Sequence, residues 1–380
     1  MDPTGAPVGA DDRPALSELR LSSFKSHRRA VLPLSPFTVF AGPSGSGKTS
    51  ALQAYTALAR LGGGEQVGTA FPDASGCVPE RARPDPQGRR GFRIGCTVDG
   101  PVGSVRLDVA VQAEPELRVV GERLTSGGQI LLSTALRDPA RRTVQAAWHT
   151  AGSVPVTRAP LPDDRLATAL LPLRVAGKTA GQRLVLAAAE QVVVALRSVF
   201  ACDPRPERMR VPVPLGAGRL HGGCGNLAEV LLRTREECGT RHAALIAASR
   251  AGCAGAVEDL AAQELADGTV RAVLDRGVFG TTPVGRLGDG ELRYLALALV
   301  LLTGPGVLEM EPVAEVLPAL QAMTVLADGF DRCLDRRQVR ELLSLAVRMG
   351  ERGHVRLVGA VQDRAPAEGV AGVSVVDLGV

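Results

Sequence analysis

The stretch that decides the fold lies near the start of the chain and reads Gly42-Pro43-Ser44-Gly45-Ser46-Gly47-Lys48-Thr49. It satisfies the pattern G-x-x-x-x-G-K-[ST] at every fixed position. The apolar segment 37–41 before it predicts a β-strand, and residues 49–61 after it predict a helix with Leu52, Tyr55 and Ala59 on one face. A strand, a glycine-rich loop and a helix in this order predict a phosphate-binding loop.

The residue types in this loop suit a triphosphate. Glycines let successive backbone N–H groups curve around phosphates, and the helix N-terminus adds a partial positive charge. We expect Lys48 to reach the β- and γ-phosphates, the Thr49 hydroxyl to bind Mg²⁺, and Ser50 to lie among the nucleotide contacts. A chance glycine-rich turn is the alternative, but it does not require the flanking strand and helix. The loop therefore predicts a nucleoside triphosphate and Mg²⁺ as ligands.

Composition limits the other classes of function. The chain has 380 residues, enough for two or three lobes, and 44 basic against 40 acidic residues give a net charge of +4. That charge is too mild to indicate nucleic-acid binding by itself. Aromatic residues make up 3%, which argues against a stacking platform for single strands. The longest apolar run, residues 295–302, is far shorter than the ~20 residues of a membrane span.

The cysteines and the N-terminus favour a cytoplasmic location. Seven cysteines are scattered without a C-x-x-C pair, which indicates reduced thiols rather than a disulfide framework or a metal site. Residues 1–14 are polar and rich in Pro, Gly and Asp, so we expect a disordered tail and no secretory signal.

Periodicity predicts the remaining elements, and the pattern turns helical from about residue 163. The predicted strands are 16–21, 30–34, 37–41, a meander over 91–132, then 269–274, 323–327, 355–360 and 373–378. The predicted helices are 49–61, 182–200, 226–237, 243–262, 290–302 and 337–349. Residues 65–91 are rich in Pro, Gly and Arg and are expected to form a loop.

A second Gly-Lys-Thr tripeptide, Gly177-Lys178-Thr179, imitates the end of a phosphate loop. Pro172 occupies the position of the first glycine of the motif, and no clear strand precedes it. We interpret this segment as a loop that leads into a helix.

Several segments resemble, in the correct order, the motifs of SMC/RecF/OLD-type ATPases. These belong to the ABC-like branch of P-loop ATPases and are often labelled AAA family ATPases in bacteria. Residues 19–26 (LRLSSFKS) and 33–39 (PLSPFTV), followed by the phosphate loop, resemble the first segment of that family. The later matches are a lobe I motif at 122–124 (ERL), a helical-lobe segment at 226–231 (NLAEVL), the signature loop at 286–293 (RLGDGELR), the Walker B strand at 325–328 (VLAD) and the D-loop at 331–335 (DRCLD).

The resemblance covers residues 15–365 and implies an α/β fold. The expected architecture is an ABC-ATPase-like head with a P-loop NTPase core, an antiparallel β-subdomain and a helical lobe. The implied domains are a tail at 1–14, the N-terminal part of lobe I at 15–130, helical lobe II at 131–317, and the C-terminal part of lobe I at 318–380. Such heads dimerise around ATP, so the resemblance implies that the nucleotide is ATP, and Gly288, Asp289 and Gly290 are expected to cap the γ-phosphate held by a second subunit. Without the resemblance, residues 288–291 would be read as an ordinary helix-capping turn.

Three departures from the family affect the expected chemistry. The acidic residue that follows the Walker B aspartate, Asp328, is here Gly329, and Asp331 is the candidate to replace it. Gln362 replaces the switch histidine, and Gly288 replaces the signature serine. Loss of a general base costs about 10²–10⁴ in rate. Asp328 is also expected to bind Mg²⁺ together with Thr49, although alone it would be read as a turn residue.

The functional prediction is a slow ATPase or ATP-driven switch that acts on a partner protein or on DNA. The alternatives are a nucleotide-binding switch module without hydrolysis and a small-molecule kinase, for which a signature loop has no use. Because OLD proteins carry a Toprim nuclease after the ATPase and this chain ends soon after Gln362, we expect a stand-alone head with a separately encoded, nuclease-like effector. DNA contact through the arginines of 81–93 is possible, but a solvated loop is the more ordinary interpretation. Lys25 and Arg293 are read either as phosphate contacts or as solvated charges.

Overall fold

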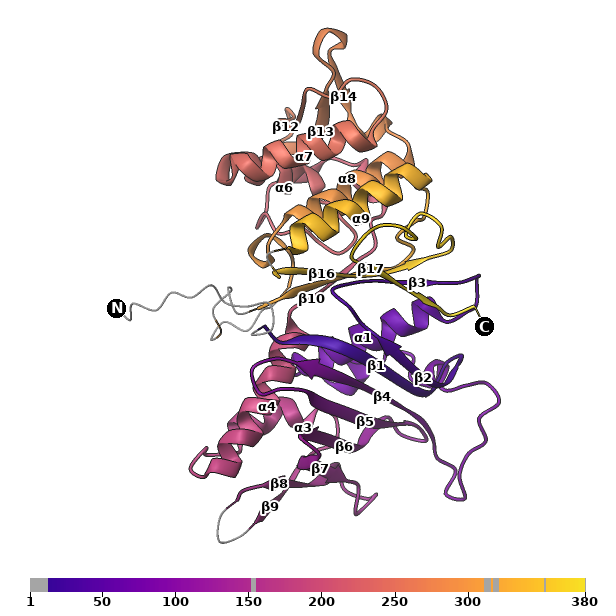
Figure 1. The fold of residues 1–380 in the computed structure, drawn as a ribbon, viewed down its shortest axis with the longest axis vertical. Coiled ribbons are helices and arrows are strands. Elements are labelled where there is room, and N and C mark those ends of the chain that lie inside the picture. The colour runs from indigo at the N-terminus through magenta and orange to yellow at the C-terminus, as the bar shows by residue number, and fades with distance from the viewer. Residues whose placement is uncertain (1–12, 152–154, 311–315, 317–320, 352, 380) are drawn as a thin grey trace. The chain divides into compact units, whose positions relative to one another are not determined.

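The computed structural model describes residues 13–151, 155–310, 316, 321–351 and 353–379 (Figure 1). Contacts divide the chain into two compact units. Unit 1 comprises residues 1–35, 45–199 and 311–322, and unit 2 comprises residues 36–44, 200–310 and 323–380. The division falls inside the predicted phosphate loop, which therefore connects one unit to the other.

Unit 1 is built on an eight-stranded sheet with the order β2-β1-β4-β5-β6-β7-β8-β9. Its strands are β1 (Ala15–Phe24), β2 (His27–Pro33), β4 (Arg90–Asp99), β5 (Val105–Glu114), β6 (Arg118–Ser126), β7 (Gln129–Ala135), β8 (Thr143–His149) and β9 (Val156–Pro162). All neighbouring strands pair antiparallel. The predicted hairpin and meander are therefore confirmed.

The sheet continues beyond the predicted meander. The sequence assigned residues 131–162 to the helical lobe, but they form the rest of β7 and the strands β8 and β9. Val144, Ala146 and Trp148 are buried in alternation with less buried neighbours, which is the period of a strand with one face in the core. The helical pattern begins where the sequence placed it, with α3 (Ala167–Leu170).

One face of this sheet is apolar and is covered by helices. Helices α1 (Lys48–Gly62) and α4 (Ala180–Arg197) both contact β1 and β4, and Figure 1 shows α4 beside the strands. The two helices pack so closely that a Cβ on Gly62 would lie 2.6 Å from the Cβ of Leu196. The short elements of the unit are α2 (Val67–Ala70), η2 (Ser75–Cys77) and η3 (Leu171–Leu173). The first two lie within the predicted loop 65–91.

Glu122 is a buried carboxylate at the N-terminus of α3. Its oxygens accept hydrogen bonds from the backbone N–H groups of Ala167 (2.6 Å) and Thr168 (2.8 Å), and from the Thr168 hydroxyl. Burial raises the pKa of Glu122 to about 7, because desolvation outweighs these hydrogen bonds. The carboxylate therefore gains a proton more readily in the folded chain than in the unfolded one.

We expect Glu122→Gln to remove a pH dependence of stability. The pKa lies near 4.5 in the unfolded chain and at about 7 in the folded chain, so the folded state binds more protons between these values. Stability from this group is then present below pH 4.5 and is lost as pH rises toward 7. Free energies of unfolding from urea denaturation should show the wild type losing on the order of 3 kcal/mol relative to the variant between pH 5 and pH 8. Glu190→Gln, at an exposed position of α4, is the control; equal pH profiles for Glu122→Gln and wild type would contradict the assignment.

Unit 2 is built around parallel strands. β15 (Met323–Ala327), β16 (Val355–Val361), β3 (Phe37–Ala41) and β17 (Val373–Asp377) pair parallel, and β10 (Val199–Cys202) completes the order β10-β15-β16-β3-β17. β3 and β15 are buried at every residue, as the central strands of a covered parallel sheet must be. These four parallel strands lie where the sequence predicted strands.

Helices and a small antiparallel sheet make up the rest of unit 2. The helices are α5 (Pro206–Met209), α6 (Leu227–Glu237), α7 (Gly239–Gly252), α8 (Asp289–Leu302) and α9 (Arg336–Gly350), with the short turns η4 (Gly277–Phe279), η5 (Val284–Arg286) and η6 (Pro305–Val307). The small sheet comprises β11 (Val213–Pro214), β12 (Asp259–Glu264), β13 (Thr269–Asp275) and β14 (Thr281–Pro283). α8 is buried at every residue from Leu292 to Leu301 and lies against α7 and α9 (Figure 1).

One predicted helix is wrong in its second half. The sequence predicted a helix over 243–262, but α7 ends at Gly252 and residues 259–264 form β12, paired with β13. At Gly252 a Cβ would overlap the ring of Tyr294, so the close approach to α8 requires glycine there. The second Gly-Lys-Thr is confirmed as a helix-leading loop, since the Thr179 hydroxyl caps α4 by accepting from Gln182 N at 3.1 Å.

The predicted domain boundaries at 14, 130 and 317 remain a prediction. The compact units change at residues 35, 44, 199, 310 and 322, so units and lobes are different divisions of the chain. Most of the predicted tail, residues 1–12, lies outside the described residues. Within the described part, none of the helices combines the length and apolar character needed to cross a membrane.

Candidate functional site

The parallel sheet of unit 2 brings three predicted site segments to one edge. In the register of the sheet Ala41 pairs with Val361 and Ala327 pairs with Gly359. The next residues along the chain are Gly42, Gln362 and Asp328, which therefore leave three adjacent strands at their carboxyl ends. Ligands of open α/β sheets bind outside this edge. The order along the sheet is the start of the phosphate loop, then Gln362, then Asp328.

The phosphate loop has the backbone that its glycines predict. Gly42, Gly45 and Gly47 adopt φ values of 148°, 86° and 97°, a region that disfavours other residues. Helix α1 begins at Lys48, directly after the loop, and neither a side-chain cap nor an acidic residue in the first turn is present at its N-terminus. An uncapped, acid-free helix N-terminus favours an anion.

Ser46 adds an independent sign of a ligand at this loop. Its hydroxyl oxygen is buried and has no hydrogen-bond partner among the described residues. A buried hydroxyl without a partner is costly, so a polar ligand at the loop would relieve it. Gly45 is exposed, and a Cβ built there would meet nothing within 4 Å. The residues present therefore fit a phosphate group, which their backbone N–H groups and Lys48 could hold.

The turn between β1 and β2 supports the loop through a residue to which the sequence assigned no role. His27 is buried, and its Nε2 donates to the Gly47 carbonyl oxygen at 3.0 Å. A Cβ on Gly47 would lie 2.6 Å from that nitrogen and 2.8 Å from Ser26 Oγ. Gly47 is therefore required both by its φ and by this contact. Lys25, in the same turn, donates from Nζ to Gln53 Oε1 of α1 at 2.6 Å.

Asp331 connects the D-loop segment to the loop after β16. Its Oδ2 accepts hydrogen bonds from the backbone N–H groups of Gln362 (2.8 Å) and Asp363 (3.1 Å). Asp331 thereby positions Gln362, whose own side chain is exposed. One carboxylate oxygen of Asp331 thus already serves a structural role, and its role as a substitute general base stays a prediction.

Arg293 was predicted to be either a phosphate contact or a solvated charge, but the structure places it inside unit 2. Its side chain is 2% exposed, so it is not a solvated charge. The guanidinium donates to the Gly329 carbonyl oxygen (2.9 Å), to the Pro204 carbonyl oxygen (2.5 Å) and to Asp203 Oδ1 (3.1 Å). It thereby connects α8 to the residue that follows Asp328. No local sequence signal could identify this role, because its partners lie 36 to 90 positions away.

The signature-like segment forms the N-terminus of α8. Gly288 and Asp289 are exposed, and Asp289 pairs with Arg210 at 2.9 Å. Glu291 accepts a hydrogen bond from Gly288 N at 3.4 Å, so this segment does act as a helix cap. Gly290 lies against the D-loop segment, where a Cβ would overlap the carbonyl oxygen of Cys333. The structure thus brings the signature-like and D-loop-like segments together within unit 2.

We expect Gly290→Ala to destabilise the protein although alanine favours helices. The added methyl group must displace the Cys333 backbone, and overpacking of this kind costs about 1–3 kcal/mol, more than the ~1 kcal/mol gain in helix propensity. Gly288→Ala is the matched control, since a Cβ there meets nothing within 4 Å. Urea unfolding of both variants measures the difference; a Gly290→Ala variant as stable as Gly288→Ala would show that α8 does not approach Cys333 this closely.

No cluster of three or more His, Cys, Asp or Glu side chains that could hold a metal ion is present within the residues that the structure describes. Binding of Mg²⁺ by Thr49 and Asp328 stays a prediction.

Comparison with solved structures identifies the fold. The chain is similar to an Smc head bound to the C-terminal winged-helix domain of ScpA, with 12% identity, a TM-score of 0.51, and coverage of 96% of this chain and 94% of that one. The SMC head domain from Thermotoga maritima matches with 12% identity, a TM-score of 0.42 and coverage of 93% and 91%. The Smc head with an extended coiled coil from Pyrococcus furiosus, bound to the C-terminal domain of ScpA, matches with 11% identity, a TM-score of 0.47 and the same coverage.

Sequence comparisons add nothing to this, since no family model and no curated protein matches the chain. The first structural match is sufficient for the architecture. The chain has the α/β fold of a P-loop ATPase head of the ABC type, as the sequence predicted.

Proposed function

We propose that this chain binds ATP together with Mg²⁺ on the loop of residues 42–49. The observation that carries the proposal is the loop itself: three glycines at positive φ, an uncapped helix N-terminus and the buried, partnerless hydroxyl of Ser46. In this proposal Lys48 contacts the β- and γ-phosphates, and the backbone N–H groups of residues 44–50 surround the triphosphate. Thr49 and Asp328 hold Mg²⁺, which neutralises charge on the phosphates when it is bound.

Hydrolysis is proposed to be slow. Gly329 stands where the resemblance implies an acidic residue. One carboxylate oxygen of Asp331 already accepts hydrogen bonds from the backbone N–H groups of Gln362 and Asp363. Gln362 is exposed at the same sheet edge as Asp328 and can orient a water molecule, but its amide cannot accept a proton as a base would. The catalytic set in this proposal is Asp328, Asp331 and Gln362.

A switch that binds ATP without cleaving it is the second candidate. The same two features favour it, namely Gly329 and the hydrogen bonds of Asp331. In either case we propose that ATP joins two copies of the chain, with Gly288, Asp289 and Gly290 of one copy contacting the γ-phosphate held by the other. Gly288 and Asp289 are exposed at the start of α8, which leaves them accessible to a second copy of the chain.

The change in assembly is proposed to act on a separately encoded partner. Two of the similar Smc heads were solved with a domain of ScpA bound, which supports a partner protein for this chain as well. The family resemblance suggests a nuclease-like effector or DNA as the partner. We propose that the chain acts in the cytoplasm.

Two measurements test the proposal. Mass photometry with and without Mg-ATP should show a monomer shifting to a dimer, and phosphate release at saturating ATP should be slow but above background. A dimer without phosphate release would favour the non-hydrolysing switch. A monomer that binds no ATP would refute both candidates.

A further inference from the structure

The outer face of the eight-stranded sheet of unit 1, opposite the helices α1 and α4, carries a hollow that the ATPase chemistry does not use. Its volume is about 540 Å³, within the range of ligand sites, and it lies over β1, β2, β4, β5 and β6. A second hollow of about 620 Å³ adjoins it and shares Ser22, Arg93 and Ala110 with it.

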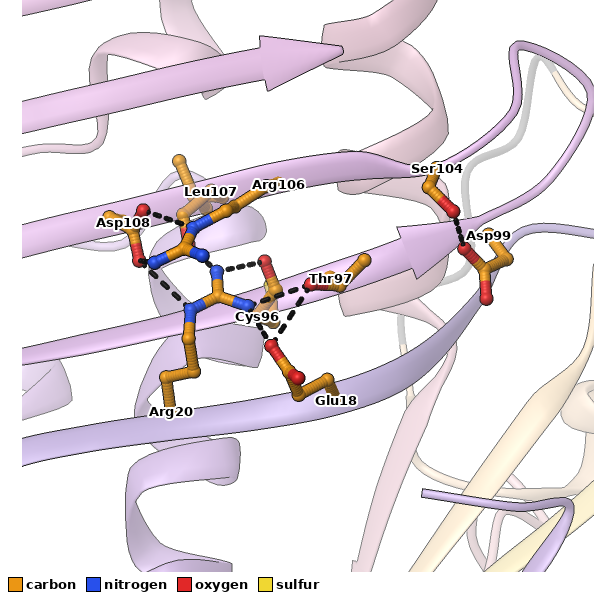
Figure 2. Close-up of polar contacts among 9 residues, drawn as sticks. All are labelled: Glu18, Arg20, Cys96, Thr97, Asp99, Ser104, Arg106, Leu107 and Asp108. Atoms are coloured by element: carbon orange, nitrogen blue, oxygen red, sulfur yellow. Dashed lines mark hydrogen bonds and ion pairs between the residues drawn. The ribbon is translucent and has the colours of Figure 1, made fainter. Parts of the chain in front are cut away.

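The floor of the hollow is made of small residues, and one charged side chain lies flat across it. Ser22, Gly95, Ala110 and Gly121 face outward there. Gly95 is required, because a Cβ would lie 2.5 Å from the Leu107 carbonyl oxygen. Figure 2 shows the Arg20 guanidinium extending from β1 across β4 toward β5. It donates to the Cys96 carbonyl oxygen (2.8 Å), the Thr97 hydroxyl (2.7 Å), the Leu107 carbonyl oxygen (3.1 Å) and Asp108 Oδ1 (3.0 Å).

The acidic groups of this face are already paired. Asp108 contacts both Arg20 (3.0 Å) and Arg106 (2.7 Å), and Glu18 contacts Arg20 (2.5 Å) (Figure 2). Glu122 borders the hollow, but its carboxylate is buried and bonded to α3. Two arginines and two carboxylates therefore compensate each other.

Three further arginines line the hollow without an ion pair to any described residue, and one of them, Arg123, lies directly across the sheet from Asp108, which already pairs with Arg20 and Arg106. Arg29, Arg93 and Arg123 are exposed, line the hollow, and their side chains make no hydrogen bond or ion pair with any residue that the structure describes. Exposed arginines alone would be ordinary. Here they surround a floor of small residues, where Gly95 leaves no room for a larger side chain, on a face whose carboxylates already pair with Arg20 and Arg106.

The sheet register fixes the spacing of these three arginines. Ser22 of β1 pairs with Arg29 on one side and with Arg93 on the other. Arg93 pairs with Ala110, which pairs with Gly121, and Arg123 is two residues further along β6 on the same face. With strands ~4.8 Å apart and a rise of ~3.4 Å per residue, the Cα atoms of Arg29 and Arg93 lie ~10 Å apart and those of Arg93 and Arg123 ~12 Å apart. The three charges form a diagonal of roughly 20 Å.

We propose that this outer face binds a short, extended, acidic segment of a partner polypeptide. The planar guanidinium forms paired hydrogen bonds with a carboxylate, and a diagonal of roughly 20 Å matches about six residues of extended chain. Nucleic acid fits less well, since Glu18 and Asp108 lie on the same face and duplex binders make about 6–10 phosphate contacts. This site is separate from the proposed ATP site and does not depend on it.

The test uses the full chain and a fluorescein-labelled octaglutamate peptide, with octaglutamine as the neutral probe. Fluorescence anisotropy should show binding of the acidic probe only, weakening as salt is added. Arg93→Glu/Arg123→Glu should weaken binding by at least about tenfold, because two favourable contacts become repulsive. The control Arg174→Glu/Lys178→Glu changes the net charge equally at exposed positions before α4 and should bind as the wild type does.

Two controls make the outcome decisive. Arg93→Lys/Arg123→Lys should keep part of the affinity, which separates loss of charge from loss of fold. A labelled DNA duplex is the competing probe. The proposal is overturned if octaglutamate does not bind, if both double charge reversals weaken binding equally, or if the duplex binds more tightly than the peptide and loses binding in Arg93→Glu/Arg123→Glu.

Discussion

Replacing Lys48 by alanine is expected to weaken ATP binding about 10- to 100-fold and to lower any phosphate release by on the order of 10²–10³-fold. A hydrogen bond from a charged group contributes about 1.5–3 kcal/mol to binding. The loss is larger in turnover, because the ammonium would also stabilise charge that develops on the phosphates. Isothermal titration with Mg-ATP and a phosphate-release assay measure the two effects.

The chain supplies its own matched control for this experiment. It contains three lysines, and Lys178 stands in a second Gly-Lys-Thr with Gly177 at a φ of 67°. That tripeptide caps α4 through Thr179 and no strand precedes it. Lys178→Ala should therefore leave ATP binding unchanged. If Lys178→Ala and Lys48→Ala had the same effect, or Lys48→Ala had none, the phosphate loop would not be the nucleotide site.

Replacing Arg293 by methionine is expected to lower the free energy of unfolding by on the order of 3 kcal/mol. Methionine approximates the length of the side chain but donates no hydrogen bonds. The change leaves the Gly329 and Pro204 carbonyl oxygens without their donor, and a buried unsatisfied polar group costs about 1–3 kcal/mol. Loss of the ion pair with Asp203 lowers the free energy of unfolding by less than loss of a fully buried pair would, because the Asp203 side chain is 41% exposed. Chemical denaturation followed by circular dichroism measures the loss.

Arg332 provides the control for Arg293. It contacts the same Asp203, at 3.4 Å, but its side chain is 54% exposed. An exposed ion pair contributes about 0–1 kcal/mol, so Arg332→Met should be nearly neutral. The Arg293→Met variant should also bind ATP less well than its stability alone explains, since Gly329 follows the proposed Mg²⁺ ligand. A variant as stable as Arg332→Met would mean that Arg293 does not connect α8 to this loop.

Elements with strong local signals were predicted close to their actual bounds. β3 and β15 match the predicted segments 37–41 and 323–327, α8 begins one residue earlier than predicted, and α1 and α9 are longer than predicted by one residue at each end. Each has a short apolar run or a clear helical period together with a glycine, a proline or a capping residue at its boundary. Such signals depend only on neighbouring residues, so they can be read from the sequence.

Elements whose structure depends on distant partners were predicted less well. Residues 259–264 have a composition that suits a helix, yet they form β12 because β13 offers a strand to pair with. Residues 143–162 extend the sheet for the same reason. Pairing with a neighbouring strand compensates for the weak preference of these segments for the strand conformation. A short stretch of sequence does not show which distant strand it will pair with, or in which register.

The sequence by itself determined the phosphate loop, because its glycines, its lysine and its threonine are adjacent in the chain and specify the backbone directly. It also determined the segments that form the four parallel strands, whereas their pairing and their common carboxyl edge come from the tertiary structure. Only the tertiary structure decided the roles of His27, Arg293 and Asp331, and the grouping of Arg29, Arg93 and Arg123 on one sheet face. Those roles depend on whether a charged or polar side chain is buried and on what lies within about 3 Å of it, and both are set by residues far away in the sequence.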